Sequence, residues 1–106
     1  MLISAPIIIL GSQLAILAAD DVPKFDIERG CRLDNAASSG IAEEQPLKRC
    51  VSDERQALEQ LEAEWSRYAG SDRVTCTAST NGGGTPSYVE LLTCLQDAKE
   101  ARALPK

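Results

Sequence analysis

The longest periodic pattern of apolar positions in this chain lies between Pro46 and Tyr68. Large apolar side chains recur there at spacings of mostly three or four residues, which places them on one face of a helix. They are Leu47, Val51, Leu58, Leu61, Trp65 and Tyr68, and only Glu54 interrupts the series. Pro46 suits the first helical position, and Gly70 marks the end of the pattern. Because one helix cannot bury its own apolar stripe, the rest of the chain must supply the other wall of a core.

Shorter helices are expected on both sides of this one. On the N-terminal side, one or two turns follow Asp26, an acceptable N-cap, although Gly30 weakens the segment. On the C-terminal side, Ser71-Asp72 offers an N-cap for a helix of about two turns. The last helix begins at Ser87, which forms a Ser-x-x-Glu capping box with Glu90. Its buried stripe is expected to contain Tyr88, Leu91, Leu92, Leu95 and Ala98.

Small and polar residues separate the predicted helices. Residues 36–45 are expected to form a loop, and the sequence Asn-Gly-Gly-Gly-Thr-Pro at 81–86 should break regular structure, because successive glycines make a fixed conformation entropically unfavourable. No stretch shows the alternation of apolar and polar residues that is typical of a strand. The pattern therefore predicts an all-α fold, a small bundle of three to four helices, with residues 20–106 as a single domain.

Residues 1–19 contain no charged side chain and have apolar runs at 7–10 and 14–17. Such a segment, followed by small residues and then Asp20-Asp21, is typical of a secretory signal peptide. It lacks the usual basic residues at its start and a complete Ala-x-Ala cleavage site. Two alternatives therefore remain, an uncleaved membrane anchor and a helix of the core. The apolar run is short for a membrane-spanning helix. Any contact of the chain with a membrane would be through such an uncleaved segment.

The four cysteines, Cys31, Cys50, Cys76 and Cys94, allow three pairings. We expect the long helix to continue to Tyr68 and the chain then to double back. Cys50 would then lie about 27 Å from the turn, and Cys76 about 9 Å from it. Because these two distances differ so much, the two cysteines would be too far apart to form a disulfide. Cys76 and Cys94 can meet across an antiparallel hairpin, and Cys31 and Cys50 can meet across the polar loop. We therefore predict the disulfides Cys31–Cys50 and Cys76–Cys94, which are typical of an oxidising compartment.

Charge and side-chain chemistry narrow the classes of function. The chain has 16 Asp and Glu against 11 scattered Lys and Arg, a net charge of −5. This balance disfavours a nucleic-acid partner and favours either a cationic protein partner or a charge that serves only solubility. It has no histidine and no Cys-x-x-Cys pair, so we expect neither a metal site nor a histidine-assisted nucleophile. Glu59, Glu62 and Glu64 fall on the polar face of the long helix, where a solvated carboxylate is the ordinary case. We predict a protein that is not an enzyme and uses no cofactor.

The glycine-rich loop is the candidate binding element. Gly82, Gly83, Gly84 and Pro86 would form an exposed connection that the disulfide Cys76–Cys94 holds at both ends, and such a loop suits insertion into the groove of a partner. The alternative is a plain connector between helices. Trp65 and Tyr68 are expected to be core residues rather than exposed anchors for a partner, because they lie at helical spacing on the apolar face.

Residues 50–104 resemble the LprI-like family of secreted lysozyme-inhibitor domains. The features that match are Trp65 on a helix, an acid- and arginine-containing stretch that ends at Cys76, the glycines at 82–84, Tyr88, and Cys94-Leu95 followed by Ala-Arg-Ala-Leu at 101–104. The resemblance implies an all-helical, disulfide-bonded envelope protein and, for some members, binding of lysozyme. We therefore expect a secreted or periplasmic binding protein, with lysozyme as a candidate partner. A small structural or stress-related protein of the cell envelope is the alternative.

Overall fold

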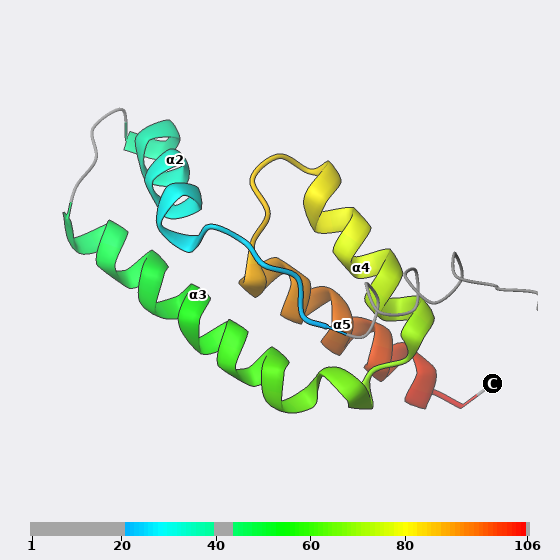
Figure 1. Cartoon of the computed structure of the whole chain (residues 1–106). Helices are drawn as coiled ribbons and strands as arrows, with labels where there is room; N and C mark the ends of the chain where they lie inside the picture. Colours follow the sequence, from blue (N-terminus) through cyan, green and yellow to red (C-terminus); the bar gives the residue numbers. More distant parts are fainter. Residues whose placement is uncertain (1–20, 40–43, 106) are drawn as a thin grey trace, which may run out of the picture.

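The computed structural model describes residues 21–39 and 44–105 (Figure 1). Within these ranges the chain forms four α-helices and no strand. They are α2 (Ile27–Ser39), α3 (Glu44–Glu64), α4 (Gly70–Gly82) and α5 (Tyr88–Ala103), and a 3-10 turn, η1 (Trp65–Arg67), follows α3. The predicted all-α fold is confirmed. The predicted signal peptide at residues 1–19 lies outside the described residues.

The other helices are arranged around α3. α2 packs along its N-terminal part, α5 along its C-terminal part, and α4 packs on α5 (Figure 1). Residues 21–26, which we call the strap, precede α2 and are held by Tyr88. The Tyr88 hydroxyl donates to the Pro23 carbonyl at 2.7 Å and accepts from the Phe25 N–H at 2.8 Å. The rings of Phe25 and Tyr88 stack with their centroids 4.6 Å apart, so the strap is fixed onto the start of α5.

The core lies between the C-terminal part of α3 and the two helices that follow it. Its buried residues, each at most 6 % exposed, are Ala57, Leu61, Trp65, Tyr68, Cys76, Tyr88, Leu91 and Leu95. The predicted core positions of Trp65 and Tyr68 are therefore confirmed. Leu47 and Val51 are only half-buried. The hydrogen bonds from the start of α5 reach α3 at Glu54, and the disulfide Cys31–Cys50 joins α2 to an earlier turn. Among the described residues, only part of the apolar stripe of α3 is therefore fully buried.

Several helix boundaries differ from the prediction. The sequence predicts a loop over residues 36–45, but α2 continues to Ser39. Gly30 lies inside this helix. A Cβ at this position would lie 3.0 Å from the Thr85 Cγ2, so any larger residue would crowd the loop after α4. α3 ends at Glu64 rather than at Tyr68, with η1 in between. α4 begins after Ala69, which offers no side-chain cap.

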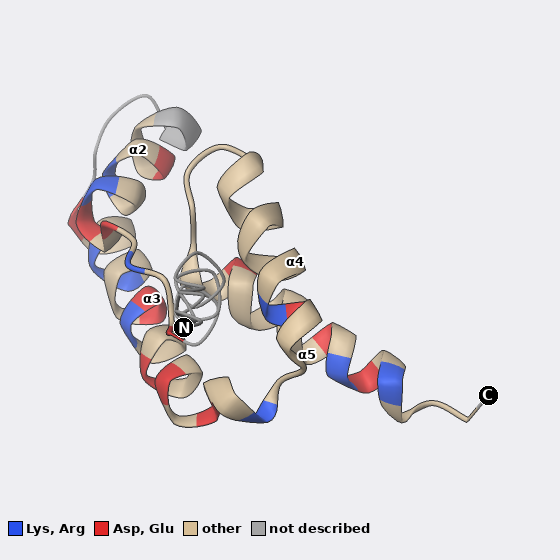
Figure 2. Cartoon of the chain, turned by 45° about the vertical axis from the view of Figure 1, so that its right-hand side comes forward, with Lys and Arg blue, Asp and Glu red and all other residues tan. Residues whose placement is uncertain are grey.

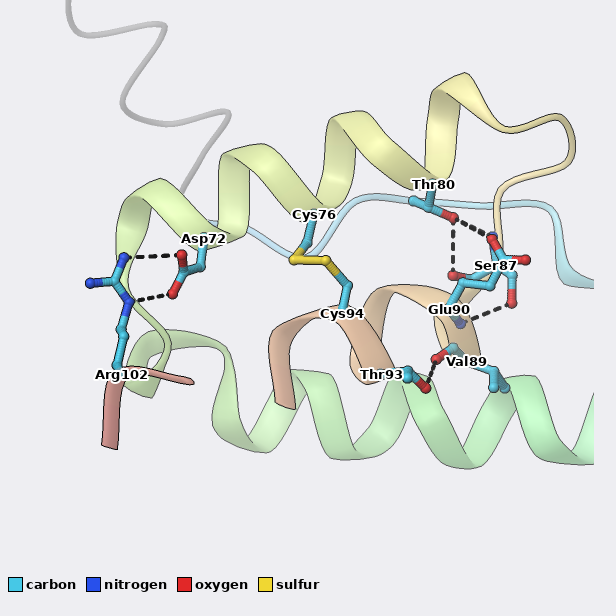
Figure 3. Close-up of a disulfide and its surroundings, with 9 residues drawn as sticks. All are labelled: Asp72, Cys76, Thr80, Ser87, Val89, Glu90, Thr93, Cys94 and Arg102. Carbon is cyan, nitrogen blue, oxygen red and sulfur yellow. Dashed lines mark hydrogen bonds and ion pairs between the residues drawn. A yellow bond between two sulfur atoms is a disulfide. The ribbon is translucent and has the colours of Figure 1, made fainter. Parts of the chain in front are cut away.

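The predicted N-cap at Ser71-Asp72 is wrong because Arg102, at the end of α5, binds these residues instead. The Arg102 Nε and Nη2 donate to the Asp72 carboxylate at 2.6 and 3.0 Å (Figure 3), and Nη2 also donates to the Ser71 Oγ at 3.1 Å. This hydrogen bond holds the pKa of Asp72 below its ordinary value. Arg102 thus joins the end of α5 to the start of α4.

Both predicted disulfides are present. Cys31–Cys50 joins α2 to α3, and Cys76–Cys94 joins α4 to α5 (Figure 3), with a Cα–Cα distance of 5.7 Å in each. A cross-link that closes a loop of this length stabilises the folded state by about 3 kcal/mol, mainly by restricting the unfolded chain. The four helices are therefore tied together in two pairs.

Candidate functional site

The predicted binding loop follows α4 directly. Gly82 is still helical, so the break in regular structure comes later than the sequence predicts. Gly83 and Gly84 are exposed, and Gly84 has a φ of 110°, which residues with a Cβ adopt only under strain. Thr85 and Pro86 are half-buried and lie beside α2. The free part of the loop is therefore short, and its role in binding a partner stays a prediction.

The chain from the middle of α4 to the start of α5 carries no charge of its own, although Asp26 and Arg29 lie with Thr85 and Pro86 around one hollow. Every residue from 74 to 89 is uncharged, and Figure 2 shows this stretch as tan ribbon over most of α4 and the loop. Acidic residues are concentrated instead on the C-terminal half of α3, where Glu59 and Glu62 are exposed. The acidic charge is therefore centred on α3 rather than on the stretch that contains the glycine loop.

The capping box predicted at the start of α5 is half formed. The Ser87 Oγ accepts from the Glu90 N–H at 3.3 Å, as predicted. The Ser87 N–H does not bond to the Glu90 carboxylate but donates to the Thr80 Oγ1 at 3.1 Å (Figure 3). The Thr80 hydroxyl lies 3.3 Å from the Glu90 carboxylate, to which it donates. Thr80, which is 4 % exposed, thus connects the last turn of α4 to the first turn of α5.

Glu54, the polar interruption in the apolar face of α3, supplies the rest of this cap. It is 9 % exposed, and its carboxylate accepts from the Ser87 hydroxyl at 2.5 Å, the Tyr88 N–H at 2.6 Å and the Val89 N–H at 3.5 Å. The first N–H groups of a helix have no partner within the helix, and the helix dipole favours a negative charge there. Glu54 therefore has a structural role, which is to bind α5 to α3.

The three glutamates that the sequence places on the polar face of α3 differ in their surroundings. Glu59 and Glu62 are exposed, as predicted. Glu64 is half-buried and accepts from the Tyr68 hydroxyl at 2.9 Å. Burial, followed by this hydrogen bond, raises the pKa of Tyr68 to about 12. Glu59 and Glu62 are therefore the glutamates of this group that present their charge fully to solvent.

Two hollows lie one after the other along one side of α3. The first, of about 650 Å³, lies between α2 and the N-terminal part of α3, and Val51 and Arg55 line it. The second, of about 580 Å³, lies between the strap and the C-terminal part of α3, and Leu58 and Glu62 line it. These four residues follow one another at spacings of three and four, which places them on the same helical face. We call the two hollows together the α3 groove.

The two ends of the α3 groove carry different charges. The first hollow is lined by Arg32, Lys48, Arg55 and Glu28, and by Glu59 at its far end. Glu28 lies 3.7 Å from Arg32 and 3.9 Å from Arg55, so two of these cations share one carboxylate. The charged residues of the second hollow are Asp21, Glu62 and Lys24. The groove is therefore basic near the start of α3 and acidic toward its C-terminal end.

Trp65 belongs both to the core and to the wall of the second hollow. It is 6 % exposed, and its Nε1–H has no hydrogen-bond partner among the described residues. The Arg73 guanidinium of α4 lies over the ring, 5.8 Å from its centroid, within the range of a cation–π contact. Because it is the single tryptophan of the chain, its fluorescence reports on this end of the groove.

The described residues contain neither a cluster of metal ligands nor a helix suited to span a membrane. Over residues 21–39 and 44–105, no three His, Cys, Asp or Glu side chains come together as ligands for a metal ion. In the same part of the chain, no helix combines the length and the apolar character needed to cross a bilayer. No family model, curated protein or solved structure matches this chain. The resemblance to the LprI-like family therefore stays a prediction from the sequence.

Proposed function

We propose that this chain is a non-enzymatic binding protein of an oxidising compartment, secreted or periplasmic, and that its partner is a cationic protein. Two disulfides that tie the described helices in pairs are compatible with such a compartment, because cytosolic thiols are kept reduced. The resemblance to lysozyme-inhibitor domains makes lysozyme the first partner to test.

The observation that carries the proposal is the acidic end of the α3 groove. Asp21 and Glu62 border a hollow whose other lining residues include Val22, Leu58 and Trp65, so carboxylates stand beside apolar surface. The side chains of lysine and arginine have the matching chemistry, since their stems pack on apolar groups while their charged ends stay near carboxylates and water. Complementary charge of this kind raises the association rate and contributes specificity.

The proposal is tested by measuring lysozyme activity against bacterial cell walls while the oxidised protein is added at increasing concentration. The reduced and alkylated protein serves as the control. Loss of activity with the oxidised form alone would support the proposal, and the affinity should then fall between low and physiological ionic strength because salt screens exposed charges. No inhibition and no binding at high micromolar concentration would reject lysozyme as the partner and favour a structural role.

Two variants separate the acidic end of the groove from the glycine loop. Glu62→Gln removes one carboxylate of the second hollow without changing its shape. Gly83→Ala changes the loop at a position where an added Cβ would make only an ordinary contact, 3.6 Å from the Ser79 carbonyl oxygen, whereas Gly84 would be strained by any side chain. Weaker binding by Glu62→Gln alone would identify the groove as the contact surface. Weaker binding by Gly83→Ala alone would favour the predicted loop.

A further inference from the structure

We infer that the whole α3 groove binds an amphipathic helix of a partner protein, and that this helix is acidic at one end and basic at the other. The inference rests on the proposed function in one respect, namely that the ligand is a protein. The inference goes beyond the proposed function because it assigns the form of the bound segment and the distribution of charge along that segment.

The apolar floor of the groove is the part of the α3 stripe that the described residues leave half-buried. Leu47, Val51 and Leu58 are half-buried, and they follow one another at intervals of four and seven residues, as residues on one helical face do. The groove extends from Leu47 to Trp65, which corresponds to about 27 Å of helix, or about 18 residues. Its other wall is formed by α2 and the strap. A trough of this kind between packed elements is where a further helix packs in a bundle.

The charges define which helix fits. At the first end the three cations Arg32, Lys48 and Arg55 outnumber two carboxylates, those of Glu28 and Glu59. At the second end Asp21 and Glu62 outnumber Lys24. Acidic turns of a partner helix are therefore favoured over the first hollow and basic turns over the second. Natural helices often carry acids in the first turn and bases in the last, because the helix dipole favours that order. Such a helix would lie parallel to α3.

The test uses the oxidised protein and two synthetic helical peptides of about 18 residues, matched to the length of the groove. Both peptides carry the same leucine stripe and the same numbers of glutamate and lysine. One has its glutamates in the first half and its lysines in the second, whereas the other has them evenly mixed. Binding is followed by the anisotropy of the labelled peptide and by the fluorescence of Trp65. The polarised peptide should bind about tenfold more tightly, since several exposed ion pairs act together.

A matched pair of variants locates the contact. Lys48 lines the first hollow, whereas its neighbour Arg49 is exposed and lies outside it. Lys48→Glu and Arg49→Glu make the same change in net charge one residue apart. We expect Lys48→Glu to weaken binding of the polarised peptide about fivefold and Arg49→Glu to change it less than about twofold. Circular dichroism of both variants verifies that the fold is retained.

The outcomes separate this inference from the proposed function. Equal affinity for both peptides, absence of binding, or equal losses from the two variants would overturn the assignment of the groove. Self-association of the protein that Lys48→Glu abolishes would also overturn it, because a second copy would then be the occupant. Lysozyme binding without any preference between the peptides would leave the proposed function standing. Binding of the polarised peptide without lysozyme binding would retain the groove and reject lysozyme as the target.

Discussion

Replacement of Glu54 is the most direct test of how α5 is held on α3. Its buried carboxylate accepts from the Ser87 hydroxyl and the Tyr88 N–H at 2.5 and 2.6 Å. Glu54→Gln keeps the shape of the side chain and one acceptor oxygen, but it removes the charge and turns an NH2 group toward one of the two donors. Asp53→Asn is the matched control, because it removes one negative charge at the adjacent position, which is exposed.

The expected loss follows from the hydrogen bonds. A hydrogen bond to a charged group contributes about 1.5–3 kcal/mol, and a buried donor left without a partner costs about 1–3 kcal/mol. The glutamine keeps one acceptor oxygen, so only part of these contributions is lost. We expect Glu54→Gln to lower the free energy of unfolding by about 2–3 kcal/mol, which includes the lost interaction with the helix dipole. This corresponds to a fall in Tm of roughly 10–20 °C for a domain of this size. Asp53→Asn should stay within about 0.5 kcal/mol of the wild type.

The measurement is urea unfolding with both disulfides intact, followed by far-ultraviolet circular dichroism and by the fluorescence of Trp65. The two signals should change together, since α5 and the tryptophan belong to the same core. If Glu54→Gln proved as stable as Asp53→Asn, the carboxylate would contribute nothing beyond what an amide provides, and its role in joining the two helices would be refuted.

Three further predictions concern other parts of the fold. Tyr88→Phe should lower the free energy of unfolding by about 1–2 kcal/mol and speed hydrogen exchange of the Phe25 amide; unchanged exchange by NMR would show that the strap is held by other contacts. Replacing Cys76 and Cys94 together by alanine should cost about 3 kcal/mol in urea unfolding, and wild-type stability would contradict this. Because folding raises the pKa of Tyr68 from 10.0 to about 12, its contribution to stability should be complete below pH 10 and lost as the pH rises through 12. Titration of its ultraviolet absorbance near pH 10 in the folded protein would be inconsistent with that.

The elements predicted correctly depend on information that is local in the chain. The apolar spacing of α3, the Ser87 cap and the cysteine separations of 19 and 18 residues all concern neighbouring segments. The length of α2, by contrast, depends on a contact between segments that are distant in the chain. Gly30 is less favourable than alanine inside a helix by about 1 kcal/mol, which argues for a short helix. The contact that makes glycine suitable there involves Thr85, far along the sequence, and no local pattern contains it.

The candidate site depends still more on distant contacts. Glu54 is visible in the sequence as a break in an apolar series, but its partner Ser87 is 33 residues away. Asp72 has the chemistry of an N-cap, yet Arg102 binds it from 30 residues further on. The half-burial of Val51 follows from where α5 meets α3. The α3 groove therefore arises from the packing of segments, and the spacing of residues predicts only its apolar floor.

The cysteines pair in the order in which they occur along the chain, the first with the second and the third with the fourth. In a polypeptide that enters an oxidising compartment N-terminus first, Cys31 and Cys50 meet before Cys76 arrives. Each bond closes a short loop, for which the entropic cost is low and the native partner is also the nearest one. Under the proposed secreted or periplasmic location, vectorial oxidation would therefore favour the native connectivity over mispaired intermediates.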